Sequence, residues 1–164
     1  MRHGEAEGRG AEGDEARALT PRGHEDCRRL AAHLKDQGAA WDTILYSSAR
    51  RAHESAKLIA AAMDSPPALE VRPELYLDGA EGLLVQLRAL PGSATAVLLV
   101  GHNPGLHALT RFLGDRSSGA MARRAVRESP PGTIAAFTCD IDDWTDLSPD
   151  RANLRDFITP DDVK

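Results

Sequence analysis

The chain has 164 residues, of which 41% are hydrophobic and only 4% aromatic, and its formal net charge is -5. This length fits one domain built on an aliphatic core, and we expect residues 1–164 to form it. The negative charge argues against a general binder of nucleic acid or of anionic membranes, so an anionic substrate would need positive charge gathered locally. Two cysteines, no membrane-length apolar run and no apolar leader predict a soluble, cytoplasmic protein.

The first stretch with a clear character is 8–18, which is Gly-rich, charged and aperiodic. It contains Gly8-x-Gly10-x-x-Gly13, formally a dinucleotide fingerprint. That fingerprint needs a strand before it and a helix opening on its last glycine, and neither is visible here. The pattern therefore favours an ordinary exposed loop.

A helix, a strand and a second helix follow. Thr20-Pro21 is a typical helix start, and Gly38 ends the apolar i, i+3, i+4, i+7 pattern behind it. The short apolar run at 43–46 predicts a buried strand. Small and apolar residues at helical spacing over 52–63 predict the next helix, which Pro66-Pro67 must end.

The middle of the chain repeats this alternation. Leucines predict a helix over about 80–90, and the apolar run at 95–100 is typical of a strand covered on both faces. Asn103 can cap a further helix whose first turn suits Pro104, and Gly114 ends it.

The last third is less regular. Residues 116–132 are basic and then Pro-rich, and they have no assignment. The run at 133–139 predicts a strand, and the acidic residues 140–150 predict a solvated edge, because they lack the glycine and closing glutamate of a calcium loop. Strands alternating with helices indicate an α/β sandwich with a mostly parallel sheet.

Two segments share one geometry, a buried strand, a short turn carrying cations, and then a helix. They are 43–59, with Arg50 and Arg51, and 95–113, with His102. Turns that leave the carboxyl ends of parallel strands line the ligand crevice, and helix N-termini and guanidinium groups both suit phosphate. Taken singly, an arginine or a histidine in such a place is more often structural. Together with Arg2-His3 at the front, they predict a cationic, phosphate-sized site.

Only two of the six histidines, His3 and His102, lie in turns of this kind. The others fall in predicted helices and are expected to be surface or packing residues: His24, His33, His53 and His107. The sequence has no His-x-x-x-His pair, no Cys-x-x-Cys pair and no P-loop lysine motif. These absences argue against a dedicated zinc site or a P-loop, and a missing Gly-x-Ser-x-Gly argues against a serine hydrolase.

Four motifs in order carry a family resemblance: Arg-His-Gly at 2–4, Leu-Thr-Pro-Arg-Gly at 19–23, Ser-Ser-Ala-Arg-Arg-Ala-His-Glu-Ser-Ala at 47–56 and Val-Gly-His-Asn-Pro-Gly at 100–105. The chain resembles the histidine phosphatase superfamily, which includes the phosphoglycerate mutases. Its small size most resembles the compact branch of SixA-like phosphohistidine phosphatases. The resemblance implies a three-layer α/β/α sandwich of the phosphoglycerate mutase kind and a phosphatase without metal or cofactor.

The resemblance also implies roles for single residues. His3 matches the nucleophile that takes the phosphoryl group, and Arg2, Arg51 and His102 match the residues that clamp its oxygens. Arg51 is chosen over Arg50 because the family pattern Ser-Pro-x-x-Arg-Ala-x-x-Thr-Ala places its arginine directly before the alanine. Neutral imidazole is a good nucleophile near pH 7, and two phosphoryl transfers are each easier than one direct hydrolysis.

The leaving group and the substrate stay open at this point. A proton donor could come from the region that holds Glu74, Asp78 and Glu81. The spacing does not select one of the three, and the site could also lack a donor. The implied substrate is a phosphohistidine protein, which could be a phosphorelay domain, or else a small phosphate ester. With no large insertion to form a lid, the pocket is expected to be open. Neither nucleic acid nor a membrane is expected as a partner.

One feature of the resemblance is incomplete. In the family, Arg-His-Gly ends a central apolar strand, and here only Met1 precedes it, so this first central strand is absent from the chain. Our hypothesis is that the sequence is short at its N-terminus; without the strand, Arg2 and His3 are expected to sit on a frayed end. The alternative function is therefore a non-catalytic, regulatory relative that binds phosphoproteins.

Overall fold

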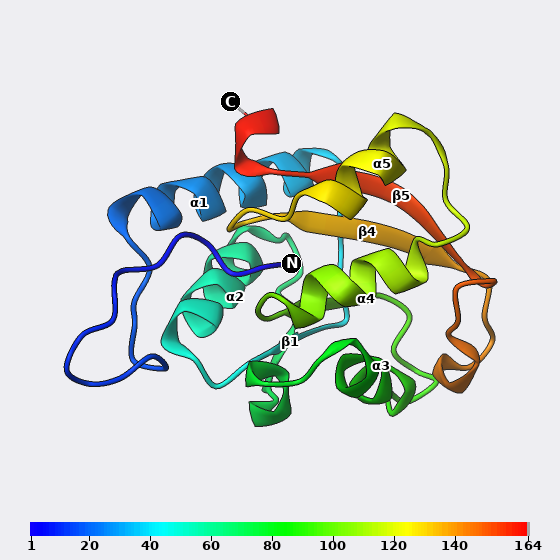
Figure 1. The fold of residues 1–164 in the computed structure, drawn as a ribbon, viewed down its shortest axis with the longest axis horizontal. Coiled ribbons are helices and arrows are strands. Elements are labelled where there is room, and N and C mark those ends of the chain that lie inside the picture. The colour runs from blue at the N-terminus through cyan, green and yellow to red at the C-terminus, as the bar shows by residue number, and fades with distance from the viewer. Residues whose placement is uncertain (164) are drawn as a thin grey trace.

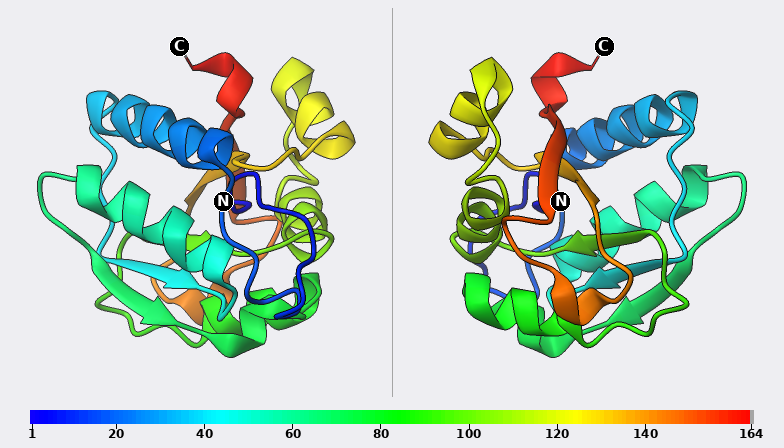
Figure 2. Two further views of the ribbon diagram at one scale, coloured as in Figure 1. Left: turned by 90° about the vertical axis from the view of Figure 1, so that its left-hand side faces the viewer. Right: turned by 90° about the vertical axis from the view of Figure 1, so that its right-hand side faces the viewer.

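The computed structural model describes residues 1–163, which form helices on both faces of a central sheet (Figures 1 and 2). The α-helices are α1 (Pro21–Asp36), α2 (Arg50–Ala62), α3 (Ala80–Arg88), α4 (Gly105–Leu113) and α5 (Gly119–Arg127). The strands are β1 (Thr43–Tyr46), β2 (Ala68–Val71), β3 (Val97–Val100), β4 (Ile134–Cys139) and β5 (Ala152–Ile158). Short 3-10 turns are η1 (Pro73–Tyr76), η2 (Trp144–Asp146) and η3 (Pro160–Asp162).

The predicted α/β class and the mostly parallel sheet are confirmed. Three strands pair in parallel in the order β2-β1-β3, and β4 pairs antiparallel with β5. Side chains alternate across the sheet. Ile44 and Leu98 face the layer of α1 and α2, whereas Leu45 and Leu99 face α3 and α4. Figure 2 shows the two helical layers on either side of the sheet.

Residues 1–3 join the two groups of strands. The Met1 amine donates to the Leu99 carbonyl oxygen at 2.6 Å, and the Gly101 amide donates to the Met1 carbonyl oxygen at 3.1 Å. On the other side, the Arg2 amide donates to the Thr133 carbonyl oxygen at 2.8 Å. The first residues thus occupy a place between β3 and β4, although they form only an isolated bridge and no strand.

The expectation of a frayed N-terminus is wrong for this structure. Met1 and His3 are both buried, because hydrogen bonds from β3 and from the β4 side hold them. Beyond Met1, a cavity of about 750 Å³ opens, and its lining includes residues of both β3 and β4. The hypothesis that a strand precedes Arg2 concerns residues outside this chain and stays a prediction.

Several local predictions need correction. Asn103 does not cap α4: the helix has Pro104 at its N-cap, the Asn103–Pro104 peptide bond is cis, and the Asn103 side chain donates instead to the Ser129 carbonyl oxygen at 3.1 Å. The unassigned stretch 116–132 contains α5. The expected cap at Thr20 is confirmed, because its hydroxyl accepts from the Gly23 amide.

Candidate active site

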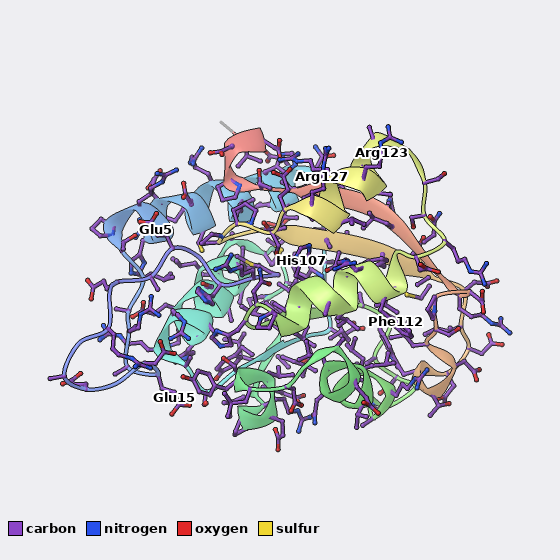
Figure 3. The ribbon with its side chains drawn as sticks, viewed as in Figure 1. Glu5, Glu15, His107, Phe112, Arg123 and Arg127 are labelled. Atoms are coloured by element: carbon purple, nitrogen blue, oxygen red, sulfur yellow. The ribbon has the colours of Figure 1, made fainter. Side chains whose placement is uncertain are left out.

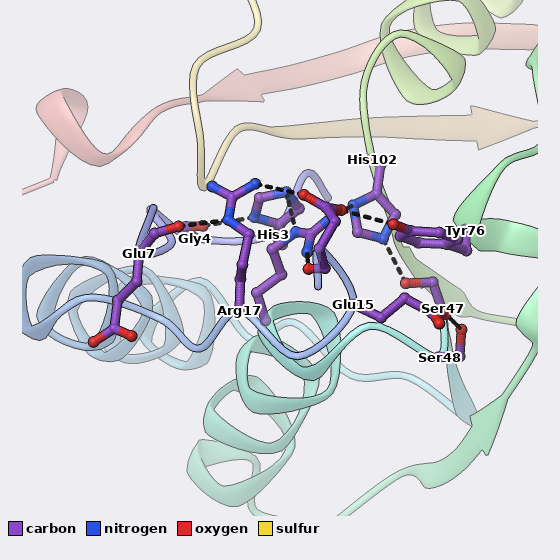
Figure 4. A network of polar contacts seen from close by, with 11 residues as sticks. His3, Gly4, Glu7, Glu15, Arg17, Ser47, Ser48, Tyr76 and His102 are labelled. Atoms are coloured by element: carbon purple, nitrogen blue, oxygen red, sulfur yellow. Dashed lines mark hydrogen bonds and ion pairs between the residues drawn. The ribbon is translucent and has the colours of Figure 1, made fainter. Parts of the chain in front are cut away.

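Three of the predicted site residues, His3, Arg51 and His102, converge at the carboxyl ends of the parallel strands. Figure 4 shows His3 beside His102. His3 comes from the N-terminal segment, Arg51 lies in the first turn of α2 behind β1, and His102 follows β3. Arg51 Nε lies 3.2 Å from His3 Nε2, and Arg51 Nη2 lies 3.3 Å from His102 Nδ1. The two imidazole ring centroids are 4.9 Å apart. The guanidinium of Arg51 therefore bridges the two histidines.

The hydrogen bonds of His3 fix its tautomer. His3 Nδ1 lies 2.6 Å from the Gly4 carbonyl oxygen. A carbonyl oxygen can only accept, so Nδ1 must carry the proton. Nε2 then keeps its lone pair, and this atom faces Arg51. The Gly4 amide is itself held by the Ser55 hydroxyl at 3.0 Å, which ties this turn to α2.

His102 has the opposite tautomer. Its Nδ1 accepts from Arg51 Nη2, so Nε2 carries the proton and donates to the Ser47 hydroxyl at 2.6 Å. Ser47 is fully buried at the end of β1 and holds the imidazole from behind. In the sequence, only its place in the family motif distinguishes this serine.

Burial controls the protonation of both histidines. The pKa of His3 is lowered to about 4, mainly by burial; the bond to the Gly4 carbonyl oxygen opposes this, and the charges of Arg51 and Arg2 contribute to it. Burial likewise lowers the pKa of His102 to about 3, with His3 and Arg51 adding to the effect. Both imidazoles are therefore neutral at pH 7, as a nucleophile needs to be.

Arg2, the fourth predicted residue, directly precedes His3 in the chain, and its side chain is held by the segment that follows α5. One guanidinium nitrogen, Nη1, donates to the Ser129 carbonyl oxygen at 2.6 Å. Its Nε is buried and has no hydrogen-bond partner within residues 1–163. Buried polar groups are rarely left unsatisfied, so this N–H is a donor that an anion could meet.

A carboxylate that the sequence analysis missed lies against the cluster. Asp14 Oδ2 accepts from Arg51 Nη2 at 2.8 Å and from the Tyr76 hydroxyl at 2.7 Å. Its Oδ1 accepts from Arg17 Nη1 at 2.9 Å. The Tyr76 hydroxyl and the Arg17 guanidinium are the main reasons that the pKa of Asp14 lies far below its usual range. Asp14 therefore stays ionised and can donate no proton near neutral pH.

This arrangement changes one expectation. The loop at 8–18 does not simply lie in solvent, because Asp14 and Arg17 turn from it toward the site. Arg51, which pairs with Asp14, is only 4% exposed. The one sequence signal that could have indicated a role for this loop is its charged pair, Asp14 and Arg17, among glycines.

The proposed proton donors lie elsewhere. Glu74 and Glu81 are exposed, and the Asp78 carboxylate lies against Gly82 at the start of α3. Within the described part of the chain, none of the three forms a hydrogen bond or an ion pair with a site residue. Tyr76, from the same segment, enters the site instead, and its ring meets that of His102 edge-on at 5.3 Å.

A neutral histidine, one buried and one half-buried arginine and a second histidine lie at the carboxyl edge of a parallel sheet in an α/β protein, where such groups suit the binding of a phosphoryl group. Comparisons with known proteins assign the family. Residues 1–76 match the profile of the histidine phosphatase superfamily (branch 1). The phosphohistidine phosphatase SixA of Escherichia coli is 35% identical over 146 residues, which cover 85% of this chain and 83% of that protein.

Solved structures agree with this assignment. A protein assigned as phosphohistidine phosphatase SixA from Nakamurella multipartitia superposes with a TM-score of 0.83 at 28% identity, over 98% of this chain and 93% of that one. The protein histidine phosphatase SixA complexed with tungstate shares the fold, with a TM-score of 0.79 at 24% identity, over 100% and 97% of the two chains. The chain belongs to the histidine phosphatase superfamily, and it is a phosphatase with SixA homologues.

Two further observations concern membrane-spanning helices and the cysteines. No helix within residues 1–163 is long and apolar enough to cross a membrane. Both cysteines, Cys27 and Cys139, are free, and Cys27 is buried against Ser55 beneath the Gly4 turn.

Proposed function

We propose that residues 1–164 act as one domain that hydrolyses phosphohistidine on a protein substrate through a covalent phosphohistidine at His3, without metal. The observation that carries the proposal is the fixed tautomer of His3. Its Nδ1–H is bonded to the Gly4 carbonyl oxygen, which leaves the Nε2 lone pair facing Arg51, where a phosphoryl group would be held. The E. coli relative carries the name phosphohistidine phosphatase, which supports the same substrate class.

In the first step, His3 Nε2 forms a bond to phosphorus while the bond from phosphorus to the substrate nitrogen breaks. The other ring nitrogen of the substrate histidine carries a proton, so the imidazole leaves as a neutral group. In the second step, water attacks phosphorus, the bond to Nε2 breaks, and inorganic phosphate leaves. Arg2, Arg51 and His102 stabilise the charge on the phosphoryl oxygens in both steps.

The protonation of His102 would have to change on binding. Its Nδ1 accepts from Arg51 in the free protein, so it offers no proton to an anion there. A phosphoryl dianion brings negative charge to within hydrogen-bond distance, and such charge raises the pKa of an imidazole. His102 would then bind a proton and donate at Nδ1, while Nε2 stays on Ser47.

The absence of an acid at the site supports phosphohistidine over a phosphate ester. Asp14 is ionised, and Glu74, Asp78 and Glu81 form no hydrogen bond or ion pair with the described site residues. An alkoxide is a poor leaving group without a proton donor, whereas imidazole leaves readily. Alkyl phosphate esters are expected to react more slowly, whereas para-nitrophenyl phosphate, whose phenolate leaves without a proton, remains a usable assay substrate.

The test is to trap the intermediate. The protein is mixed with a histidine-phosphorylated protein carrying radioactive phosphate, in the presence of EDTA, and the reaction is quenched in alkali. We expect a label on this chain that is stable to alkali and labile to acid. His3→Ala should remove both label and turnover. His24→Ala, at a half-buried residue of α1 whose ring lies 3.7 Å from the Glu54 carboxylate, should retain them.

The alternative function, a regulatory relative that binds phosphoproteins without turnover, predicts a different result. Its supporting observation is Asp14, which already occupies the guanidinium of Arg51. Under this alternative, phosphate or the phosphoprotein binds, no label transfers to His3 and no phosphate is released.

A further inference from the structure

A groove with its own chemistry lies between α4 and α5, apart from the residues of the candidate active site. Its volume is about 800 Å³. Small residues, Ala108 and Ala122, line it, and the loop at 114–119 closes one end. Two larger apolar side chains are exposed there, Phe112 at 43% and Val126 at 48%. Figure 3 labels Phe112 on α4 and Arg123 and Arg127 on α5.

Three arginines surround this apolar surface. Arg111 belongs to α4, and Arg123 and Arg127 belong to α5. All three are exposed, and none forms an ion pair within residues 1–163. Their neighbour Arg124 behaves differently, because it pairs with Glu128 and Asp162 on the other side of α5.

The charge pattern is unfavourable in isolation. Arg123 and Arg127 are four residues apart on one helical face, and like charges at that spacing destabilise a helix. One carboxylate, Asp115, lines the groove and does not pair with either of them. A local excess of positive charge around exposed apolar groups, in a chain of net charge -5, is complementary to an apolar surface bordered by carboxylates.

The helices that form the groove are connected to the catalytic residues. His107 of α4 lies 3.1 Å from the carbonyl oxygens of Ala125 and Val126 of α5. The segment leaving α5 reaches Ser129, whose carbonyl oxygen accepts from both Arg2 and Asn103. A partner bound in the groove would therefore rest on the same framework that positions the phosphate clamp.

We propose that the α4–α5 groove docks an acidic amphipathic helix of the phosphoprotein substrate. An apolar helix face would cover Phe112 and Val126, and carboxylates on its borders would pair with Arg123 and Arg127. A concave site favours a helix over a flat membrane surface, and one exposed aromatic ring offers little to stacked bases. The inference rests on the proposed function, since it assigns that reaction a protein substrate.

The binding test uses two synthetic helical peptides of about 18 residues, which is five turns. Both carry leucine at i, i+3, i+4 and i+7; one has glutamate beside the leucines and the other has lysine. Fluorescence anisotropy at low salt should show that the glutamate peptide binds at least about tenfold more tightly. The double variant Arg123→Glu/Arg127→Glu should weaken it by about tenfold or more. The matched control Arg28→Glu/Lys35→Glu changes the same net charge on α1 and should bind as the parent does.

Further readouts separate this proposal from its rivals. Val126→Ser should weaken the glutamate peptide too, and circular dichroism should show that each variant keeps its fold. Equal binding of both peptides, no effect of the Arg123→Glu/Arg127→Glu variant, or binding of phosphatidylglycerol vesicles in place of the peptide would overturn the proposal. So would self-association of the chain through this face in sedimentation experiments.

Failure of the groove proposal can be distinguished from failure of the catalytic proposal. Hydrolysis of para-nitrophenyl phosphate by the Arg123→Glu/Arg127→Glu variant should be unchanged, because neither arginine touches a described site residue. Peptide binding should also survive His3→Ala. A phosphoenzyme without peptide binding refutes the groove alone, whereas peptide binding without a phosphoenzyme refutes the mechanism alone.

Discussion

Replacing Gly23 by alanine should damage the active site, although the change is made in a helix. Alanine in place of glycine inside a helix ordinarily stabilises it by about 0.5–1 kcal/mol. Here an added Cβ would lie 2.1 Å from the carbonyl oxygen of Glu5, and real Cβ atoms essentially never come closer than 3.0 Å to such an atom. Backbone must therefore move by about 1 Å, and overpacking of this kind costs about 1–3 kcal/mol.

A shift of the Glu5 backbone would also move His3. Its carbonyl oxygen accepts the Thr20 amide at 3.0 Å, and the preceding carbonyl, that of Gly4, orients His3. A misplacement of about 1 Å can cost about 10²-fold in rate. We expect Gly23→Ala to lower kcat/KM on para-nitrophenyl phosphate by about that factor and to lower the free energy of unfolding in urea.

The matched control is Gly8→Ala, in the loop beyond the same turn, where an added Cβ meets nothing within 4 Å. It should retain both activity and stability. If Gly23→Ala is as active and as stable as this control, the contact between α1 and the Arg-His-Gly turn does not position His3, and the reasoning fails.

Two other predictions concern charge. The pKa of the Met1 amine is lowered to about 5, that of His3 to about 4 and that of His102 to about 3, each first by burial. The unfolded chain therefore binds more protons, so the free energy of unfolding should fall as the pH drops. The fall should begin below about pH 8 for the amine and below about pH 6.5 for the histidines, with a slope of about 1.4 kcal/mol per pH unit for each group. Urea titrations at several pH values check this, and a flat profile would contradict the burial of these groups. Asp14→Asn removes the carboxylate that occupies Arg51, so inorganic phosphate should inhibit about tenfold more strongly, a gain of about 1.4 kcal/mol. Weaker inhibition would instead mean that Asp14 positions Arg51 for the anion.

Local sequence signals determined most of the secondary structure. Apolar runs marked β1 and β3, because a strand buried on both faces must be apolar throughout. Thr20 and Pro21 marked the start of α1, because capping is decided within one turn of helix. β5 was missed although it alternates in part, since only its pairing with β4 distinguishes it from a polar tail.

The candidate site was also visible in the sequence, but only in part. Four motifs in order named His3, Arg2, Arg51 and His102, because the chemistry of phosphate restricts the residue types that can handle it. Nothing local identified Asp14. It reaches Arg51 through a loop whose path depends on contacts with distant parts of the chain.

The position of the N-terminus shows the same division most clearly. The sequence determined that Arg-His-Gly is present and that only Met1 stands before it. The tertiary structure decided that these residues are held firmly, since their hydrogen-bond partners are Leu99, Gly101 and Thr133. Backbone groups of a short segment cannot pair with one another in an extended conformation, so only distant strands can supply their partners.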